Sequence, residues 1–110
     1  MNIEDWKSQM KRGTLEYCVL ILFSHCDRYG YEIMNALSKY SIIATKESTM
    51  YPLLRRLEKD NFLRSYWQET NEGLPPRKYY SLTKEGEEYT RLISLEWDNL
   101  TTAIENLKGV

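Results

Sequence analysis

The sequence predicts a mainly α-helical protein with one small β-hairpin and a long C-terminal helix. Over most of the first 60 residues, apolar side chains recur every three or four positions, which is the period of amphipathic helices. From residue 63 to residue 82 the period changes to two, on either side of a seven-residue polar loop. The helical period then returns and continues almost to the last residue. At 110 residues, the chain has the length of one compact domain.

Two helical segments are predicted before residue 25. Residues 2–12 place their apolar side chains on one face of a short helix, and we expect Gly13 to break it. Residues 14–24 are apolar on nearly every side, which is typical of a helix at the centre of a small domain. Cys18 in this segment is interpreted as a small core residue. The apolar face of the first segment comprises Ile3, Trp6 and Met10.

Counted from residue 14, a second helix follows, and Asp27 can cap its start. Its apolar side chains recur at helical spacing up to Tyr40. Residues 41–45 are rich in β-branched side chains, so we expect a short extended connection that ends at a capping Thr45 or Ser48.

The third helix has one apolar and one polar face. Pro52 is tolerated only near a helix start, so it predicts an irregular first turn. Asp60 and Asn61 predict the end, because Asn adopts the left-handed conformation more readily than most residues. The apolar face comprises Met50, Leu53, Leu54 and Leu57, and the polar face comprises Thr49, Pro52, Arg55, Arg56 and Lys59.

Residues 63–69 and 77–82 predict two aromatic-rich strands joined by a loop of turn-forming residues. An isolated two-stranded ribbon is marginally stable, so the hairpin must pack against the helices. Trp67 is interpreted as part of that packing.

Thr83 is expected to cap the final helix, whose first turn is acidic, as the helix dipole favours. The helix carries an apolar stripe about five turns long, which is more than one small domain can cover. An exposed stripe of this kind indicates an interface. Its members are Tyr89, Leu92, Ile93, Trp97, Leu100, Ala103, Ile104 and Leu107.

Composition and residue spacing exclude several classes of protein. The longest apolar run, residues 17–23, is far shorter than the roughly 20 residues that cross a bilayer, and no secretion signal is visible, so we expect a cytoplasmic protein without a membrane partner. Two cysteines without CxxC spacing and one histidine cannot form a clustered tetrahedral zinc site. Because no glycine-rich phosphate loop and no nucleophile–histidine arrangement occurs, we expect no metal, no cofactor and no enzymatic activity.

The formal net charge of −1 conceals two opposed regions. Residues 39–84 carry a net charge of +4, and the rest of the chain carries −5. The near-neutral total is therefore compatible with a DNA-facing side and an acidic side elsewhere.

Helices, a hairpin and a final long helix, in this order, predict a winged helix-turn-helix. In such a unit the second helix of the motif enters the major groove, and the hairpin, or wing, contacts the DNA backbone or the minor groove. Hydroxyl groups can bind phosphates or base edges, and arginine can reach a phosphate or a guanine. The expected DNA contacts are Thr45, Lys46, Ser48, Thr49, Tyr51 and Arg55, together with Arg77 and Lys78, which follow a rigid Pro75–Pro76 pair.

Most of these residues have a second interpretation. Ser48 and Thr49 also suit helix capping, and the basic side chains of the same helix suit an ordinary solvated face. Arg77 and Lys78 also suit protection of an exposed strand edge. The alternative function is a winged-helix module that binds protein and not DNA, but the polar and basic face of the third helix favours DNA.

Several motifs together resemble the PadR-like family of transcriptional regulators. They span nearly the whole chain, and the single helix after the wing is similar to the smaller subfamily. Met50 stands where the family usually has Leu, and Asn61 stands where Gly is common, but both keep the same physical role. The matching stretches are 13–16 (GTLE), 29–33 (YGYEI), 48–58 (STMYPLLRRLE), 76–83 (PRKYYSLT) and Gly86.

The resemblance implies a homodimeric repressor in which residues 1–82 form the DNA-binding unit and residues 83–110 form the dimerisation helix. Two-fold symmetry then places two recognition helices about one DNA turn apart, facing a pseudo-palindromic operator in double-stranded DNA. The expected dimer interface comprises Leu92, Ile93, Trp97, Leu100, Ile104 and Leu107.

The resemblance also implies a ligand site. In some similar short regulators, a tryptophan of the final helix pairs with its symmetry mate around flat aromatic compounds. By this resemblance, Trp97, with Trp6 and Met10, binds a planar aromatic or phenolic effector that relieves DNA binding. The alternative is that Trp97 only packs the dimer interface, where aromatic residues are common.

Overall fold

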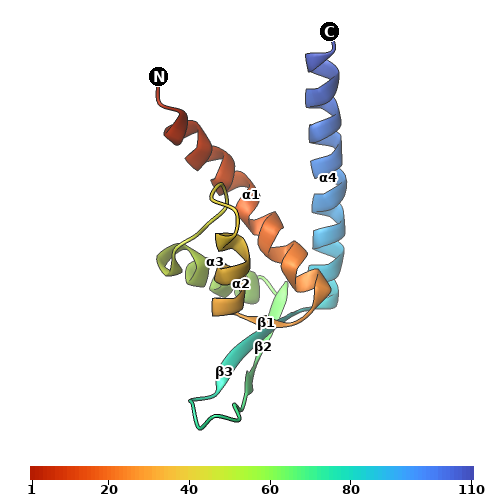
Figure 1. Cartoon of the computed structure of the whole chain (residues 1–110). Coiled ribbons are helices and arrows are strands. Elements are labelled where there is room, and N and C mark those ends of the chain that lie inside the picture. Colours follow the sequence, from red (N-terminus) through yellow and green to blue (C-terminus); the bar gives the residue numbers. More distant parts are fainter.

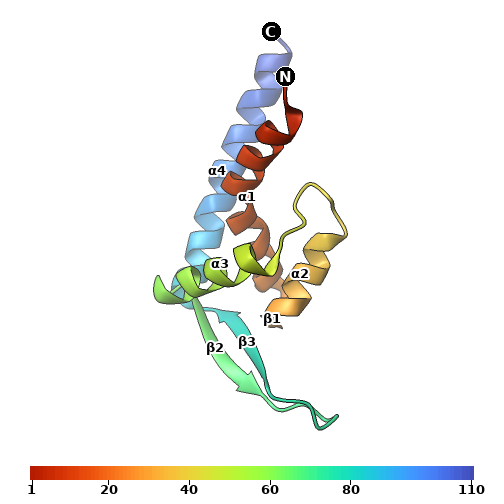
Figure 2. The ribbon, with the colours of Figure 1, turned by 90° about the vertical axis from the view of Figure 1, so that its left-hand side faces the viewer.

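The computed structural model describes all 110 residues and contains four helices and one small antiparallel sheet (Figure 1). In chain order the elements are α1 (Ile3–His25), β1 (Arg28–Tyr29), α2 (Gly30–Ser38), α3 (Glu47–Lys59), β2 (Leu63–Gln68), β3 (Arg77–Leu82) and α4 (Lys84–Lys108). The long helices α1 and α4 approach each other near the sheet and diverge toward the chain termini (Figure 1). The β2–β3 hairpin projects from the opposite end of the molecule (Figures 1 and 2).

α1 is one continuous helix, so the expected break at Gly13 is wrong. The Asn2 side chain caps its start by accepting a hydrogen bond from the Glu4 backbone at 3.0 Å. A glycine inside a helix costs only about 1 kcal/mol relative to alanine, which packing of the flanking turns can outweigh. Because the helix continues, residues on both sides of Gly13 share one helical register.

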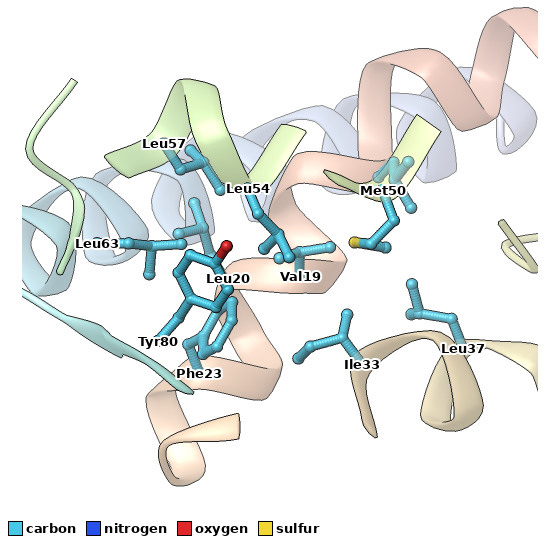
Figure 3. Close-up of a cluster of buried hydrophobic side chains, with 11 residues drawn as sticks. Val19, Leu20, Phe23, Ile33, Leu37, Met50, Leu54, Leu57, Leu63 and Tyr80 are labelled. Carbon is cyan, nitrogen blue, oxygen red and sulfur yellow. The ribbon is translucent and has the colours of Figure 1, made fainter. Parts of the chain in front are cut away.

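Eleven buried side chains form the core between α1, α2, α3 and the sheet (Figure 3). Val19 and Leu20 of α1 are completely buried, which confirms residues 14–24 as the central helix. Phe23 meets Tyr80 of β3 edge to face, with ring centroids 6.3 Å apart. The predicted inward residues of α3 are buried except Leu53, which is half-buried. The core comprises Leu15, Val19, Leu20, Phe23, Ile33, Leu37, Met50, Leu54, Leu57, Leu63 and Tyr80.

The start of α2 does not use the predicted cap at Asp27. The helix begins after Tyr29, whose backbone N–H donates to Glu32 Oε1 at 3.2 Å. The Asp27 carboxylate instead accepts a hydrogen bond from the Tyr66 hydroxyl at 2.7 Å. After α2, residues 41–43 form turns, so the predicted extended connection is also wrong.

The start of α3 likewise differs from the prediction. The helix begins after Lys46, so Ser48 lies inside its first turn and neither Ser48 nor Thr45 is the cap. The Thr45 hydroxyl donates to the Ile43 carbonyl at 2.8 Å. The helix runs unbroken through Pro52, and the expected irregular first turn is absent. Proline removes only the bond to the Ser48 carbonyl, and that residue is exposed, so water can replace the bond.

The sheet confirms the predicted hairpin and adds a strand that the sequence did not predict. β2 and β3 pair from Leu63 opposite Leu82 to Gln68 opposite Arg77, and β1 pairs with the other edge of β3, with Tyr29 opposite Tyr79. A two-residue strand is too short to show a period. β1 ties the start of α2 to the base of the wing.

Trp67 is 69% exposed, so its predicted role in hairpin packing is wrong. It lies opposite Lys78 in the sheet, beyond the part of the hairpin that the helices cover. The nearer pair on the same face, Ser65 and Tyr80, is the last one at which a side chain is buried.

The predicted end of α3 and the predicted start of α4 are confirmed. Asn61 adopts the left-handed conformation, with φ of 65°, and ends the turn after α3. The Thr83 hydroxyl caps α4 by accepting a hydrogen bond from the Gly86 backbone at 2.9 Å. Gly86 passes so close to the residue before β2 that an added Cβ would lie 2.0 Å from the Phe62 carbonyl oxygen. No helix of the chain combines the length and the hydropathy that crossing a membrane requires.

Candidate nucleic-acid interface and interhelical cleft

The outer face of α3 is polar, basic and open to solvent. Ser48, Thr49 and Arg55 are exposed on it. Arg55 makes no side-chain hydrogen bond and no ion pair within the chain. These three residues, which the sequence predicted as DNA contacts, therefore share one unobstructed surface.

Arg56, next to Arg55, has a different environment. Its guanidinium lies 3.4 Å from Glu16 Oε1 of α1 and 3.8 Å from Asp60 Oδ2. The same Glu16 oxygen accepts a hydrogen bond from the Tyr89 hydroxyl of α4 at 3.4 Å. Burial, together with the Glu16 carboxylate, raises the pKa of Tyr89 and keeps this hydroxyl protonated as a donor. Arg56 thus joins α3 to α1 and α4.

Tyr51 lies at the junction of α2 and α3. A Cβ on Gly30 would lie 2.6 Å from Tyr51 Cε1, so the glycine makes room for the ring. Burial and then the Glu47 carboxylate raise the pKa of Tyr51, which keeps its hydroxyl neutral. The half-buried ring fixes the position of α3 against α2.

The connection before α3 is held by α1. Lys11 Nζ donates to the Ala44 carbonyl, one residue before Thr45. Thr45 is half-buried and is committed to its bond with Ile43, whereas Lys46 is exposed. Of these two predicted DNA contacts, only Lys46 is open to an anion.

The two predicted basic residues of the wing, Arg77 and Lys78, point to opposite faces of the sheet, because side chains alternate along a strand. Lys78 Nζ lies 3.6 Å from Glu58 Oε1 of α3 and 5.4 Å from the Tyr80 ring centroid. Arg77 Cζ lies 4.8 Å from the ring centroid of Tyr29, and no carboxylate pairs with it. The two predicted cations of the wing therefore lie in different surroundings.

An apolar cleft of about 590 Å³ lies between α1 and α4. Trp97 lines it, and its ring lies 5.7 Å from that of Tyr17 at a tilt of 45°. The Tyr17 hydroxyl donates to Ser94 Oγ at 3.1 Å. Trp6 and Met10 line the α1 side, so the three residues expected at the ligand site share this cleft. The polar residues of its lining are Gln9, Thr14 and Glu96.

Tyr17 lines the cleft but was not predicted to do so. Tyr17 follows Met10 by seven positions, or about two helical turns, so a continuous helix places both on one face. The expected break at Gly13 concealed this relation. Tyr29 was missed as a partner of Arg77 because β1 is too short to be recognised.

The apolar stripe of α4 is largely uncovered. Leu92, Leu100 and Ile104 are exposed, and Leu107 is 72% exposed. Ile93 alone among the six expected interface residues packs against the core. No other element of the chain covers the outer half of this stripe.

Comparison with known families identifies the class of protein that has this arrangement. The model of the transcriptional regulator PadR-like family matches residues 19–102. The chain belongs to the PadR-like family of transcriptional regulators. The matched segment contains all of the candidate DNA contacts, from Thr45 to Lys78. PadR-like proteins are regulators of transcription and not enzymes.

Solved structures of PadR-like and other transcriptional regulators resemble this chain over nearly its whole length. A transcriptional regulator from Streptococcus is 40% identical, with a TM-score of 0.80 over 91% of this chain and 97% of that chain. A PadR-like regulator from Bacillus cereus is 34% identical, with a TM-score of 0.81 over 90% and 95%. A protein from Lysinibacillus sphaericus is 34% identical over 90% of this chain and 92% of its own length. The chain therefore shares its fold with solved structures of transcriptional regulators from other bacteria.

Proposed function

We propose that this PadR-like regulator is a homodimeric repressor that binds double-stranded DNA through α3 and the wing. The observation that carries the proposal is the outer face of α3, where Ser48, Thr49 and Arg55 are exposed and Arg55 has no partner in the chain. A free guanidinium beside small hydroxyls suits base edges and phosphates of the major groove. A protein-binding face would instead be expected to expose apolar anchors.

The two parts of the chain divide the work in this proposal. Residues 1–82 bind DNA, and residues 83–110 form the dimer through the exposed stripe of α4. The stripe supports this role because Leu100 and Leu107 would otherwise leave an apolar surface in water. A symmetric dimer presents two α3 helices to one operator.

The proposed operator is tested by selection from a random duplex pool. The unmodified protein should enrich a pseudo-palindrome whose half-sites are about 10 base pairs apart, one DNA turn. The enriched duplex then serves in quantitative binding measurements. Failure to enrich any sequence would overturn the DNA-binding function and favour the protein-binding alternative.

The proposed effector is a planar aromatic or phenolic compound bound in the cleft between α1 and α4. The cleft volume of about 590 Å³ lies within the range of small-molecule sites, and its lining is mainly apolar and aromatic. Trp97, Trp6 and Met10 supply stacking faces and a flexible thioether. A compound held there contacts α4 and α1 together, so it can shift their spacing and with it the spacing of the two α3 helices.

Tryptophan fluorescence tests the effector. Planar aromatics should quench the unmodified protein, and the quenching should fall sharply in Trp97→Ala. Trp67→Phe is the matched control, because that tryptophan lies on the wing, far along the chain from the cleft. Equal quenching of Trp97→Ala and the unmodified protein would leave Trp97 as dimer packing only.

A further inference from the structure

We propose that Tyr29 is a positioning residue that holds Arg77 in place to bind a DNA phosphate; this inference rests on the proposed DNA-binding function. Tyr29 stands at the junction of β1 and α2, and Arg77 opens β3. The two are 48 positions apart in the sequence but meet where β1 pairs with β3. Their contact defines a single cationic site at the loop end of β3.

The geometry suits a cation held over an aromatic face. Arg77 Cζ lies 4.8 Å from the Tyr29 ring centroid, inside the range of about 6 Å for such contacts. Arg77 is half-buried and forms no ion pair or side-chain hydrogen bond in the chain. The N–H donors of the guanidinium lie in its plane, and none of them has a hydrogen-bond partner within the chain. A phosphate can therefore be bound without breaking any existing bond.

The Tyr29 ring is itself fixed from several sides. Its backbone pairs opposite Tyr79, and the two rings lie 5.4 Å apart. The Tyr31 ring stacks near the Tyr29 ring, with centroids 6.3 Å apart. The Glu32 carboxylate accepts a hydrogen bond from the backbone N–H of Tyr29. The platform beneath Arg77 is thus part of the folded sheet and of the capped start of α2. A guanidinium fixed in this way loses less side-chain entropy on binding than a free one.

The other wing cation lacks this freedom. Lys78 is already 3.6 Å from the Glu58 carboxylate on α3. An anion approaching Lys78 would compete with that carboxylate, whereas an anion approaching Arg77 meets no acidic partner in contact with it. Of the two adjacent cations, the structure assigns phosphate binding to Arg77 and a structural bond to Lys78.

A double-mutant cycle on the selected operator duplex tests this assignment by fluorescence anisotropy. Tyr29→Leu should weaken binding about fivefold while leaving every charge in place. Arg77→Ala should weaken binding at least as much and lower the salt dependence by about one phosphate contact per subunit. Tyr29→Leu should then have little further effect in the Arg77→Ala background, and Tyr29→Phe, which keeps the ring, should bind like the unmodified protein.

Two further variants keep the test decisive. Arg77→Lys retains the charge and leaves Tyr29 untouched, and its affinity should fall between those of the unmodified protein and Arg77→Ala, because lysine keeps the charge for the phosphate but lacks the planar fork of arginine. Tyr31→Leu removes a neighbouring ring that does not contact Arg77, and it should have a smaller effect than Tyr29→Leu.

The outcomes separate this inference from the function on which it rests. An equal loss from Tyr29→Leu with and without Arg77, or full binding by Arg77→Ala while Arg55→Ala fails to bind, overturns the role of Tyr29 but not DNA binding. The absence of any specific complex with the unmodified protein overturns both.

Discussion

Neighbouring basic side chains of this protein have different partners. Arg56 and Lys78 form ion pairs with carboxylates, whereas Arg55, next to Arg56 in the sequence, forms no ion pair within the chain. Sequence alone cannot separate the members of such a pair, because the carboxylates that hold Arg56 and Lys78 belong to other elements of the fold. Substitution of the paired residues is expected to affect packing between elements, and substitution of Arg55 to affect DNA binding.

Exposure of Trp67 leads to a prediction about stability. Because 69% of this residue is in contact with water, Trp67→Ala should lower the free energy of unfolding by less than about 1 kcal/mol. A packed tryptophan would cost about 3–5 kcal/mol on the same substitution. Urea denaturation followed by circular dichroism distinguishes the two, and a loss in the higher range would mean that another surface covers Trp67.

The ion pair between Glu88 and Arg91 leads to a prediction about pH. Two hydrogen bonds from Arg91, of 3.0 and 2.6 Å, lower the pKa of Glu88 below its ordinary value of 4.5. A lowered folded-state pKa means that the pair stabilises the fold above the ordinary pKa, and that this contribution is lost as pH falls through the folded value. NMR titration of Glu88 should show the lowered pKa, and Arg91→Ala should return it to the ordinary value. An unchanged pKa in Arg91→Ala would show that another group causes the shift.

At the scale of elements, local signals predicted most of the fold. The alternation of residues 63–69 and 77–82 predicted the hairpin. Asn61 predicted the turn between α3 and the hairpin, and Thr83 predicted the start of α4. Each of these signals acts within a few residues along the chain, so it is visible in the sequence. The polar face of α3 was predicted for the same reason, because helical period fixes which side chains share a face.

The elements that were missed depend on contacts between distant segments. β1 exists only because β3 pairs with it. Glu32, and not the predicted Asp27, takes part in capping α2, whereas Asp27 accepts a hydrogen bond from Tyr66. The buried residues of α1 all follow Gly13, and the cost of about 1 kcal/mol for a glycine within a helix is small enough for the helix to continue through it. The expected break at Gly13 prevented the prediction of Tyr17 as a cleft residue, because Tyr17 shares a face with Met10 only when α1 is continuous.

Two glycines test this account of the elements in opposite directions. Gly13→Ala should raise the free energy of unfolding by about 0.5–1 kcal/mol, because alanine is the better helix former and nothing lies within 4 Å of its Cβ. Gly86→Ala should lower it by about 2–3 kcal/mol or more, because the Cβ would overlap the Phe62 carbonyl at 2.0 Å. Denaturant unfolding of both variants provides the measurement. Destabilisation by Gly13→Ala would indicate that a second chain packs against Gly13. A Gly86→Ala variant as stable as the unmodified protein would contradict the close contact between Gly86 and the Phe62 carbonyl.

At the scale of the whole molecule, the two long helices leave an apolar surface that a single chain does not cover. α1 and α4 diverge toward the termini, and the stripe of α4 faces solvent along its outer half (Figure 1). The proposed dimer covers this stripe and sets the separation of the two α3 helices. The excess of positive charge lies in residues 39–84, which include α3 and the wing, and the excess of acids lies in the rest of the chain.

Leu100→Asp tests the dimer directly. A carboxylate in the middle of an apolar interface is costly to bury, so this variant should sediment as a monomer at concentrations where the unmodified protein is a dimer. Thr102→Asp is the matched control, because Thr102 is also exposed but lies outside the stripe, and it should remain dimeric. Analytical ultracentrifugation that finds the unmodified protein monomeric would contradict the proposed assembly.

The central claim, that the outer face of α3 binds DNA, is tested most directly by the affinity of Arg55→Ala for the selected operator across a range of salt concentrations. The unmodified protein should bind with a constant whose logarithm falls linearly with the logarithm of salt concentration, as counterion release requires. Arg55→Ala should bind at least about tenfold more weakly, and the control Arg91→Ala, on α4, should bind like the unmodified protein. Equal affinities of Arg55→Ala and the unmodified protein, or a complex insensitive to salt, would contradict the account.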